Sequence, residues 1–189
     1  MKKLNTEKLL AEHIFVAQAS YDLLEPLMQI SQRIIERLQA SGKILFCGNG
    51  GSAADAQHFA AELVGRFYVE RRALAAIALT TDTSVLTCLG NDYSYDIIFS
   101  RQLEALCQPG DVVVLLTTSG DSPNILRAAR TAQACGAYTV GFTGKAGGQL
   151  KTRVDDCLIV PSDNTPRIQE MHLFLGHTLC QAIENAFAS

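Results

Sequence analysis

Two segments of the sequence carry side chains that could bind a divalent metal ion. His58 and Glu62 fall in a stretch with helical periodicity, and side chains four residues apart project from one face of a helix. Gln169 and His177 lie two turns apart on roughly one face of the C-terminal segment, which is also predicted to be helical. Together the four would supply nitrogen and oxygen ligands suited to zinc or a similar borderline metal. Spacing alone leaves open the alternative that His58 and Glu62 form an ordinary surface or core pair.

The other two histidines are predicted to be structural. His172 points about 140° away from His177, because successive residues of a helix are rotated by roughly 100°. His13 has no neighbouring carboxylate or cysteine that would single it out as a ligand.

A glycine-rich loop precedes the helix of His58. It contains Gly48-x-Gly50-x-x-Ala53, a small-residue variant of the dinucleotide-binding fingerprint. That fingerprint requires an acidic residue about 20 positions further on, at the end of the second strand, where it binds the ribose hydroxyls. Glu70 has nearly this spacing but precedes the second apolar run, and Asp82 follows that run too late. A dinucleotide site is therefore the weaker interpretation of this loop.

A sugar phosphate is the stronger interpretation, because a second loop has similar properties. Each loop follows an apolar run and opens a predicted helix, whose free N–H groups and positive dipole end favour an anion. Gly50 and Gly51 allow close approach of the backbone, and Ser52, Ser119 and Ser122 add hydroxyl donors. In a parallel sheet both loops would lie at the same end, where ligands bind. The alternative is that both are simple capped turns.

The elements that must position these residues are predicted to form an α/β fold. Continuous apolar runs alternating with amphipathic stretches are typical of a parallel sheet covered by helices on both faces. The runs are KILFC (43–47), AIAL (76–79), DVVVLLT (111–117), YTVGFT (138–143) and CLIV (157–160).

Capping signals predict where the helices begin and end. Ser52 is the predicted start of one helix, Ser122-Pro123 opens the next, and Gly136 closes it. Thr165-Pro166 is the predicted cap and first turn of a last helix that runs to about residue 188. Before the sheet, residues 5–40 have helical periodicity interrupted by Pro26, which predicts two helices or one kinked helix.

Composition limits the class of protein. With 189 residues, 48% hydrophobic and 19% charged, the chain suits one domain with a sizeable core. A net charge of −3 provides no overall field for nucleic acid or acidic lipid, and no apolar run is long enough to span a bilayer. Six scattered cysteines without a C-x-x-C pair are predicted to be reduced core residues. A charged N-terminus without a signal-peptide pattern predicts a cytoplasmic location.

Five separated segments resemble one known family in both content and order. They are CGNGGSAADAQHFAAEL, LTTDTSVLTCLGNDYSY, TTSGDSPNIL, GFTGKAGG and VPSDNTPRIQEMHLFLGH. The sequence closely resembles the bacterial phosphoheptose isomerases, also called sedoheptulose 7-phosphate isomerases, of the sugar isomerase (SIS) fold. The likeness extends from about Gly42 to the C-terminus and includes the N-terminal helices in outline.

The resemblance implies an architecture and a reaction. The fold would be a three-layer αβα sandwich with a five-stranded parallel sheet of flavodoxin-like type. Residues 1–189 would form a single SIS domain, with a helical segment at 1–40 that packs in the oligomer and an α/β core at 41–189. The subunits would form a homotetramer with active sites at subunit interfaces. The reaction would convert D-sedoheptulose 7-phosphate into D-glycero-D-manno-heptose 7-phosphate, the entry step to the heptose of the lipopolysaccharide core.

The resemblance also implies roles for individual residues. One zinc ion per subunit would be bound by His58, Glu62, Gln169 and His177. Glu62 would act as the base of an enediol mechanism, and His177 as an acid or proton shuttle. Where the family usually has S-T-S-G, Thr117 stands in place of the first serine and keeps its hydroxyl. The implied substrate contacts are Asn49, Gly50, Gly51, Ser52, Glu62, Asn91, Asp92, Thr117, Thr118, Ser119, Ser122 and Gln169.

Two other functions in the same fold are weighed against this one. A non-catalytic SIS adaptor that binds the bacterial replication initiator shares several of these segments, but it replaces the residues that match Glu62 and His177. Both are present here. A sugar-phosphate-sensing SIS regulator would usually be fused to a DNA-binding or transport domain, and this sequence contains no such segment. The enzyme is therefore the favoured hypothesis.

Overall fold

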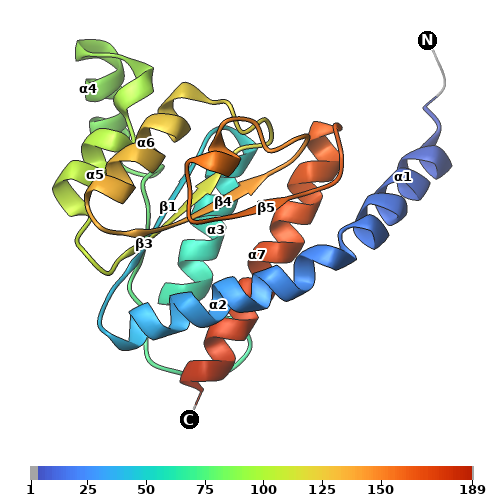
Figure 1. The fold of residues 1–189 in the computed structure, drawn as a ribbon, viewed down its shortest axis with the longest axis horizontal. Coiled ribbons are helices and arrows are strands. Elements are labelled where there is room, and N and C mark those ends of the chain that lie inside the picture. Colours follow the sequence, from blue (N-terminus) through green and yellow to red (C-terminus); the bar gives the residue numbers. More distant parts are fainter. Residues whose placement is uncertain (1–3, 189) are drawn as a thin grey trace.

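The computed structural model describes residues 4–188, and its core is a five-stranded parallel sheet (Figure 1). The strand order is β2-β1-β3-β4-β5, which is the flavodoxin-like order. All five predicted apolar runs form strands, with their bounds differing by one or two residues at some ends. The strands are β1 (Ile44–Gly48), β2 (Ala76–Ala78), β3 (Val112–Leu116), β4 (Tyr138–Thr143) and β5 (Asp156–Ile159).

Helices cover both faces of the sheet, which confirms the predicted αβα sandwich. Side chains alternate along β3, so that Val112 and Val114 face one layer while Val113 and Leu115 face the other. The first layer consists of α2 (Leu24–Gln39), α3 (Gly51–Val64) and α7 (Thr165–Phe187). The second consists of α4 (Thr83–Asp92), α5 (Ser100–Leu106) and α6 (Pro123–Ala134). Short 3₁₀ turns η2 (Tyr95–Ile97) and η3 (Leu150–Thr152) lie between elements.

The N-terminal segment forms two helices, and the break differs from the predicted one. Helix α1 (Thr6–Ala19) ends before a 3₁₀ turn, η1 (Tyr21–Leu23), and α2 follows directly. Pro26 lies in the first turn of α2, where a missing N–H breaks no helical hydrogen bond. Pro26 therefore does not cause the kink that the sequence predicts there. Helix α1 projects away from the sheet (Figure 1).

Two predicted helix caps are wrong by a residue or two, and one is confirmed. Helix α3 begins at Gly51 and the residue before it is Gly50, whose φ of 55° favours glycine, so Ser52 lies inside the first turn. Helix α7 is preceded by Asn164, which makes Thr165 its first residue instead of its cap. Ser122 precedes α6 as predicted, with Pro123 in the first position.

The predicted burial of the cysteines holds only in part. All six are free; Cys47 and Cys180 are buried in the core, whereas Cys88 is exposed on α4. Burial raises the pKa of the Cys180 thiol to about 12, so this group stays protonated and inert at neutral pH. Within residues 4–188, no helix combines the length and apolarity that crossing a bilayer would require.

Candidate active site

The loops that follow β1 and β3 start side by side at one end of the sheet. Gly48 and Leu116 are register partners in the parallel pair β1–β3, so the chain leaves both strands at the same level. Between these two strands the order of connection reverses, and this point is where open α/β sheets bind ligands. The structure therefore brings together the two serine-bearing loops that the sequence predicts to share one ligand.

Two glycines of the first loop lie in close contact with neighbouring groups. A Cβ on Gly48 would lie 2.3 Å from the carbonyl oxygen of Ser52, so the first turn of α3 packs directly on the end of β1. A Cβ on Gly51 would lie 2.5 Å from the side-chain nitrogen of Gln169 on α7. Ser52 is 3% exposed. These contacts hold the first turn of α3 at the end of the sheet, where the N–H groups of Ser52 and Ala53 donate to the carbonyl oxygens of Asn49 and Gly50 at 3.0 Å each.

The second loop gathers three hydroxyl groups. Thr117 Oγ1 lies 3.1 Å from Ser122 Oγ and 3.4 Å from Ser119 Oγ, and Ser119 Oγ accepts the N–H of Asp121. Gly120 has a φ of 74°, and a Cβ there would lie 2.0 Å from the carbonyl oxygen of Gly147. Only glycine fits this contact, which fixes the loop against the segment after β4.

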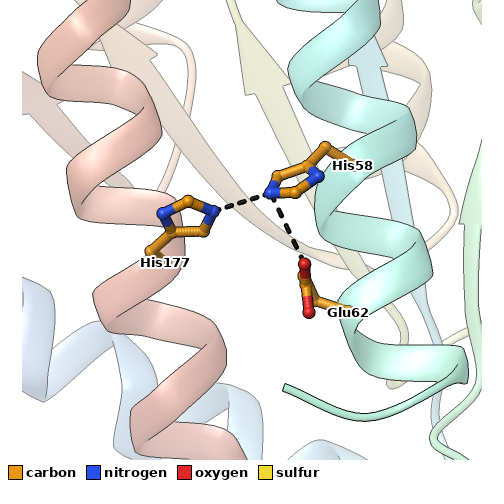
Figure 2. A group of neighbouring side chains, drawn as sticks. All are labelled: His58, Glu62 and His177. Atoms are coloured by element: carbon orange, nitrogen blue, oxygen red, sulfur yellow. Dashed lines mark hydrogen bonds and ion pairs between the residues drawn. The ribbon is translucent and has the colours of Figure 1, made fainter. Parts of the chain in front are cut away.

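Three of the four predicted metal ligands lie together on the outer side of the helical layer. His58 and Glu62 come from α3 and His177 from α7 (Figure 2). His58 Nε2 lies 2.6 Å from His177 Nε2 and 3.5 Å from Glu62 Oε1. One ligand atom of each residue lies within 4.8 Å of the others. The side chains of His58 and Glu62 are 43% and 20% exposed, so a substrate could reach them.

The chemistry of this donor set fits a borderline divalent metal. Burial lowers the pKa of His177, and the nearby His58 lowers it further against the opposing effect of Glu62. A neutral imidazole has the free lone pair that a metal requires. Two imidazole nitrogens and a carboxylate are the ligands of many catalytic zinc sites, in which a fourth position stays open for water or substrate. Glu62, His58 and His177 therefore could hold zinc.

Close packing of α3 on α7 makes this cluster possible. A Cβ on Gly176 would lie 2.0 Å from the ring of Phe59, so only glycine allows the two helices to approach at this point. The Phe59 ring lies edge-on to the His177 ring at a centroid distance of 6.3 Å, and the Phe67 ring lies 5.4 Å away. Two aromatic rings, those of Phe59 and Phe67, therefore lie close to the His177 ring.

Gln169, the fourth predicted ligand, lies beside the loop end of α3. Its amide contacts Gly51, whereas His177 contacts His58. These two contacts come in the same order along both helices, so α3 and α7 run parallel. Eight residues of helix separate Gln169 from His177 by about 12 Å along the axis. Its role as a metal ligand or substrate contact stays a prediction.

Asn91 and Asp92, two predicted substrate contacts, lie at the exposed C-terminal end of α4. Asn91 Nδ2 donates to Asp92 Oδ1 at 2.8 Å, and the Cys88 thiol lies 3.4 Å from Asp92 Oδ2. Asp82 is one of the two acidic residues compared with the ribose-binding position of the dinucleotide fingerprint. In the structure it caps α4 by accepting the N–H of Val85. This cap use of Asp82 removes the remaining support for a dinucleotide site.

Both histidines predicted to be structural have structural contacts. His172 is fully buried, and its Nε2 donates to the carbonyl oxygen of Thr143 at 3.0 Å. Burial lowers the pKa of His172 to about 4, opposed by this hydrogen bond. His13 pairs with Glu170 at 2.7 Å and so joins α1 to α7. No spacing in the sequence predicts that pair, because its partners are far apart along the chain.

Sequence reasoning missed a carboxylate next to the metal-ligand cluster. Asp55 precedes His58 by three residues on α3, and its Oδ2 is buried without a hydrogen-bond partner among the described residues. Burial raises the pKa of Asp55, and the proximity of His58 opposes the increase. Helical spacing to His58 could have revealed this residue.

A buried ion pair behind the cluster was also missed. Glu184 of α7 accepts the N–H groups of Phe67, Tyr68 and Val69 at 2.7, 2.6 and 3.2 Å, and its carboxylate lies 3.5 Å from Arg71 Nε. The Arg71 guanidinium also donates to the carbonyl oxygen of Glu62 at 2.7 Å. The pair therefore holds the end of α3 and the segment after it against α7. No local pattern predicts a partnership between residues this far apart.

Comparisons with known proteins agree with this geometry. A family model described as the SIS domain matches residues 12–144. A phosphoheptose isomerase of Aliarcobacter butzleri is 51% identical over 185 residues, covering 98% of each chain. A solved phosphoheptose isomerase from Neisseria gonorrhoeae is 44% identical with a TM-score of 0.90 and covers 95% of this chain and 97% of its own. One from Francisella tularensis is 38% identical with a TM-score of 0.92, covering 95% and 96%. With its parallel sheet, its paired loops and its His58, Glu62 and His177 cluster, this chain belongs to the phosphoheptose isomerase family of SIS-domain proteins.

Proposed function

We propose that this protein is an isomerase that converts D-sedoheptulose 7-phosphate into D-glycero-D-manno-heptose 7-phosphate. The observation that carries the proposal is the meeting of Glu62 with His58 and His177, on the helix that begins at the first of the two serine-bearing loops. The alignments with phosphoheptose isomerases support the same conclusion, because they cover nearly the whole of both chains and about half of the aligned residues are identical. The product would enter the synthesis of the lipopolysaccharide core heptose. The six free cysteines agree with a reducing cytoplasm as the location.

The two parts of the site match the two ends of an extended sugar phosphate. His58 follows Gly51 by seven residues, which places it about 10 Å along α3 from the loops. The phosphate would bind the N–H groups and hydroxyls of the loops, and the carbonyl end of the seven-carbon chain would reach the cluster. Binding of the remote phosphate would then hold the reacting carbons in place.

The reaction transfers a proton between neighbouring carbons through an enediol. We assign Glu62 as the base that removes the proton from C1 of the ketose and returns it at C2. His177 lies across the cluster and would deliver and recover protons at the substrate oxygens. When bound at His58, Glu62 and His177, zinc would polarise the carbonyl and hydroxyl oxygens of the substrate. We keep Gln169 as a proposed fourth ligand and substrate contact.

The remaining proposed substrate contacts surround the two loops. Their backbone N–H groups, amides and hydroxyls would bind the phosphate and the sugar hydroxyls. They are Asn49, Gly50, Gly51, Ser52, Asn91, Asp92, Thr117, Thr118, Ser119 and Ser122.

We also propose a homotetramer with one zinc ion per subunit and active sites at subunit interfaces. Apolar side chains on the N-terminal helices support an assembly: Leu10 is 60% exposed, Ile14 46% and Phe15 66%. Exposing these apolar side chains to water does not stabilise a monomer, whereas burying them between subunits would stabilise an assembly. The adaptor function is not favoured, because Glu62 and His177 are both present and lie in one cluster.

The direct test is incubation of the protein with D-sedoheptulose 7-phosphate and zinc. We expect NMR to show the growth of an aldose phosphate anomeric signal, with uptake of solvent deuterium at C2. A protein that is folded and loaded with metal, yet leaves the ketose unchanged, would contradict the proposal.

A further inference from the structure

A pair of amide side chains joins the two loops where they meet. Asn49 Nδ2 donates to Asn124 Oδ1 at 2.9 Å, and Asn124 Nδ2 donates back to Asn49 Oδ1 at 2.9 Å. Asn49 follows β1, and Asn124 lies in the first turn of α6. Asn124 is 2% exposed. Because Asn124 is shielded from water, loss of Asn49 would leave the Asn124 amide with unmade hydrogen bonds, which is costly.

A third element holds the same amide. The hydroxyl of Tyr95, at the start of η2, donates to Asn49 Oδ1 at 3.1 Å. An amide oxygen has two lone pairs, and here both have donors. Rotating the amide of Asn49 by half a turn would break both hydrogen bonds to Asn124, because it would set N–H against N–H and oxygen against oxygen. Its orientation is therefore determined by residues on α6 and η2.

The fixed orientation leaves one donor of Asn49 available. Its Nδ2 carries two hydrogens, one of which binds Asn124. Across residues 4–188, no protein acceptor takes the other. This N–H belongs to the loop in which the proposed function places the sugar phosphate, between Gly48 and the N-terminus of α3.

We propose that Asn124 and Tyr95 are positioning residues for substrate binding. They hold the Asn49 amide so that its remaining N–H is ready for an oxygen of the phosphorylated sugar, and they tie the two loops into a single binding site. The inference rests on the proposed function. A donor oriented before binding loses less conformational freedom when the substrate arrives, which improves affinity. Neither residue touches the substrate in this role, and both act through Asn49.

The test compares Asn124→Ala and Tyr95→Phe with the wild-type protein in isomerisation of sedoheptulose 7-phosphate. For Tyr95→Phe we expect KM to rise about fivefold, the equivalent of one neutral hydrogen bond, and for Asn124→Ala about tenfold or more. We expect kcat to stay within a factor of about two, because uniform binding affects KM alone. Tyr93→Phe is the matched control: Tyr93 lies two residues away, is 67% exposed and should leave both constants unchanged.

Repeating both substitutions in an Asn49→Ala background separates positioning from general structure. If the two residues act through Asn49, neither should raise KM further once Asn49 is removed. Rises that persist in that background, or a wild-type KM in both single variants, would overturn the inference.

Protection by inorganic phosphate gives a second readout that does not require turnover. We expect phosphate to raise the Tm of the wild-type protein and of Tyr93→Phe more than that of Asn124→Ala. If the wild-type protein binds phosphate but does not isomerise the ketose, the proposed function fails while this comparison still decides the inference. The inference is contradicted if phosphate raises the Tm of all the variants equally, or if it raises the Tm of none of them.

Discussion

Glu62 and His177 face one another from parallel helices at a partly exposed surface. Glu62 is the only carboxylate whose oxygen groups with the two imidazole nitrogens among the described residues. A carboxylate bound tightly to a metal is a weaker base, so under the proposed mechanism Glu62 would have to divide its role between holding a cation and moving a proton. The second carboxylate, Asp55, is close in sequence but its free oxygen is buried.

Replacing Glu62 by Gln tests the assignment of the base. We expect kcat to fall at least a hundredfold, since a positioned base contributes on that order, with thermal stability close to that of the wild type. Glu36→Gln, an exposed glutamate on α2, is the control and should leave kcat unchanged. A Glu62→Gln protein that turns over at a near-normal rate would remove Glu62 from the mechanism.

Removing the metal tests the ligand set. Exhaustive chelation should reduce activity strongly, and added zinc should restore it with about one equivalent per subunit. Metal content can be measured directly, and His58→Ala should lower it because one imidazole is lost. Full activity in rigorously metal-free protein would show that the cluster works without zinc.

Helices α3 and α7 act as a unit, because a glycine on one accommodates an aromatic ring of the other. The Phe59 ring lies where a side chain on Gly176 would be. The same pair of helices carries all three members of the ligand cluster. Changing the distance between the helices should therefore affect both stability and metal affinity.

Gly176→Ala tests this coupling between packing and the site. We expect the free energy of unfolding to fall by about 1–3 kcal/mol because the methyl group overpacks the core, and zinc affinity to fall with it. Gly90→Ala on α4 is the matched control, since a Cβ there meets nothing within 4 Å. That variant should be neutral or more stable by up to about 1 kcal/mol. Equal stability of the two variants would contradict the packing argument.

Glu184 links α7 to the segment after α3, and its ionisation should make stability pH-dependent. Burial raises the pKa of Glu184, but the N–H groups of Tyr68, Phe67 and Val69 and the charge of Arg71 outweigh it, so the net pKa is lowered. A lowered folded-state pKa contributes stability that is present above the unfolded pKa, about 4.3 for Glu, and is lost as pH falls through the folded value.

Glu184→Gln should therefore destabilise the protein by about 3 kcal/mol at pH 7, because it leaves the buried Arg71 charge unpaired. The difference from the wild type should shrink as the pH drops below about 4. Denaturant unfolding at several pH values measures both quantities. A difference that does not change with pH would show that the carboxylate charge is not the source of the effect.

As a whole, the molecule has an asymmetric outline, since α1 projects from the sandwich (Figure 1). His13 and Glu170 tie α1 to α7, while large apolar side chains on α1 stay exposed. Such a helix is stable only if its apolar face is covered, which a second copy of the chain could do.

The double variant Leu10→Glu/Phe15→Glu tests the proposed assembly. We expect the mass by light scattering to fall below that of the wild-type protein, because two charges would replace apolar side chains that are 60% and 66% exposed in the single chain. Activity should fall with it if active sites lie at subunit interfaces. Gln18→Glu, an exposed position on the same helix, should change neither. An unchanged mass would exclude this face from the assembly.

Much of the architecture could be predicted because it depends on local patterns. Short apolar runs predicted all five strands, and the Ser122-Pro123 signal predicted the start of α6. The predictions that failed depend on backbone conformation, which the residue types alone do not determine. Gly50 takes a left-handed φ and moves the start of α3 ahead of Ser52, and α1 ends before Pro26 is reached.

The sequence by itself determined the sheet, the paired loops and the face on which His58 and Glu62 project, since periodicity and capping act within a few residues. It also determined that His177 is available as a ligand on the last helix. Only the tertiary structure decided which of these side chains meet. Close contact at Gly176 brings His177 to His58, while Gln169 lies beside Gly51. The Asn49–Asn124 pair likewise depends on the adjacency of β1 and β3, which hydrogen bonding across the sheet creates.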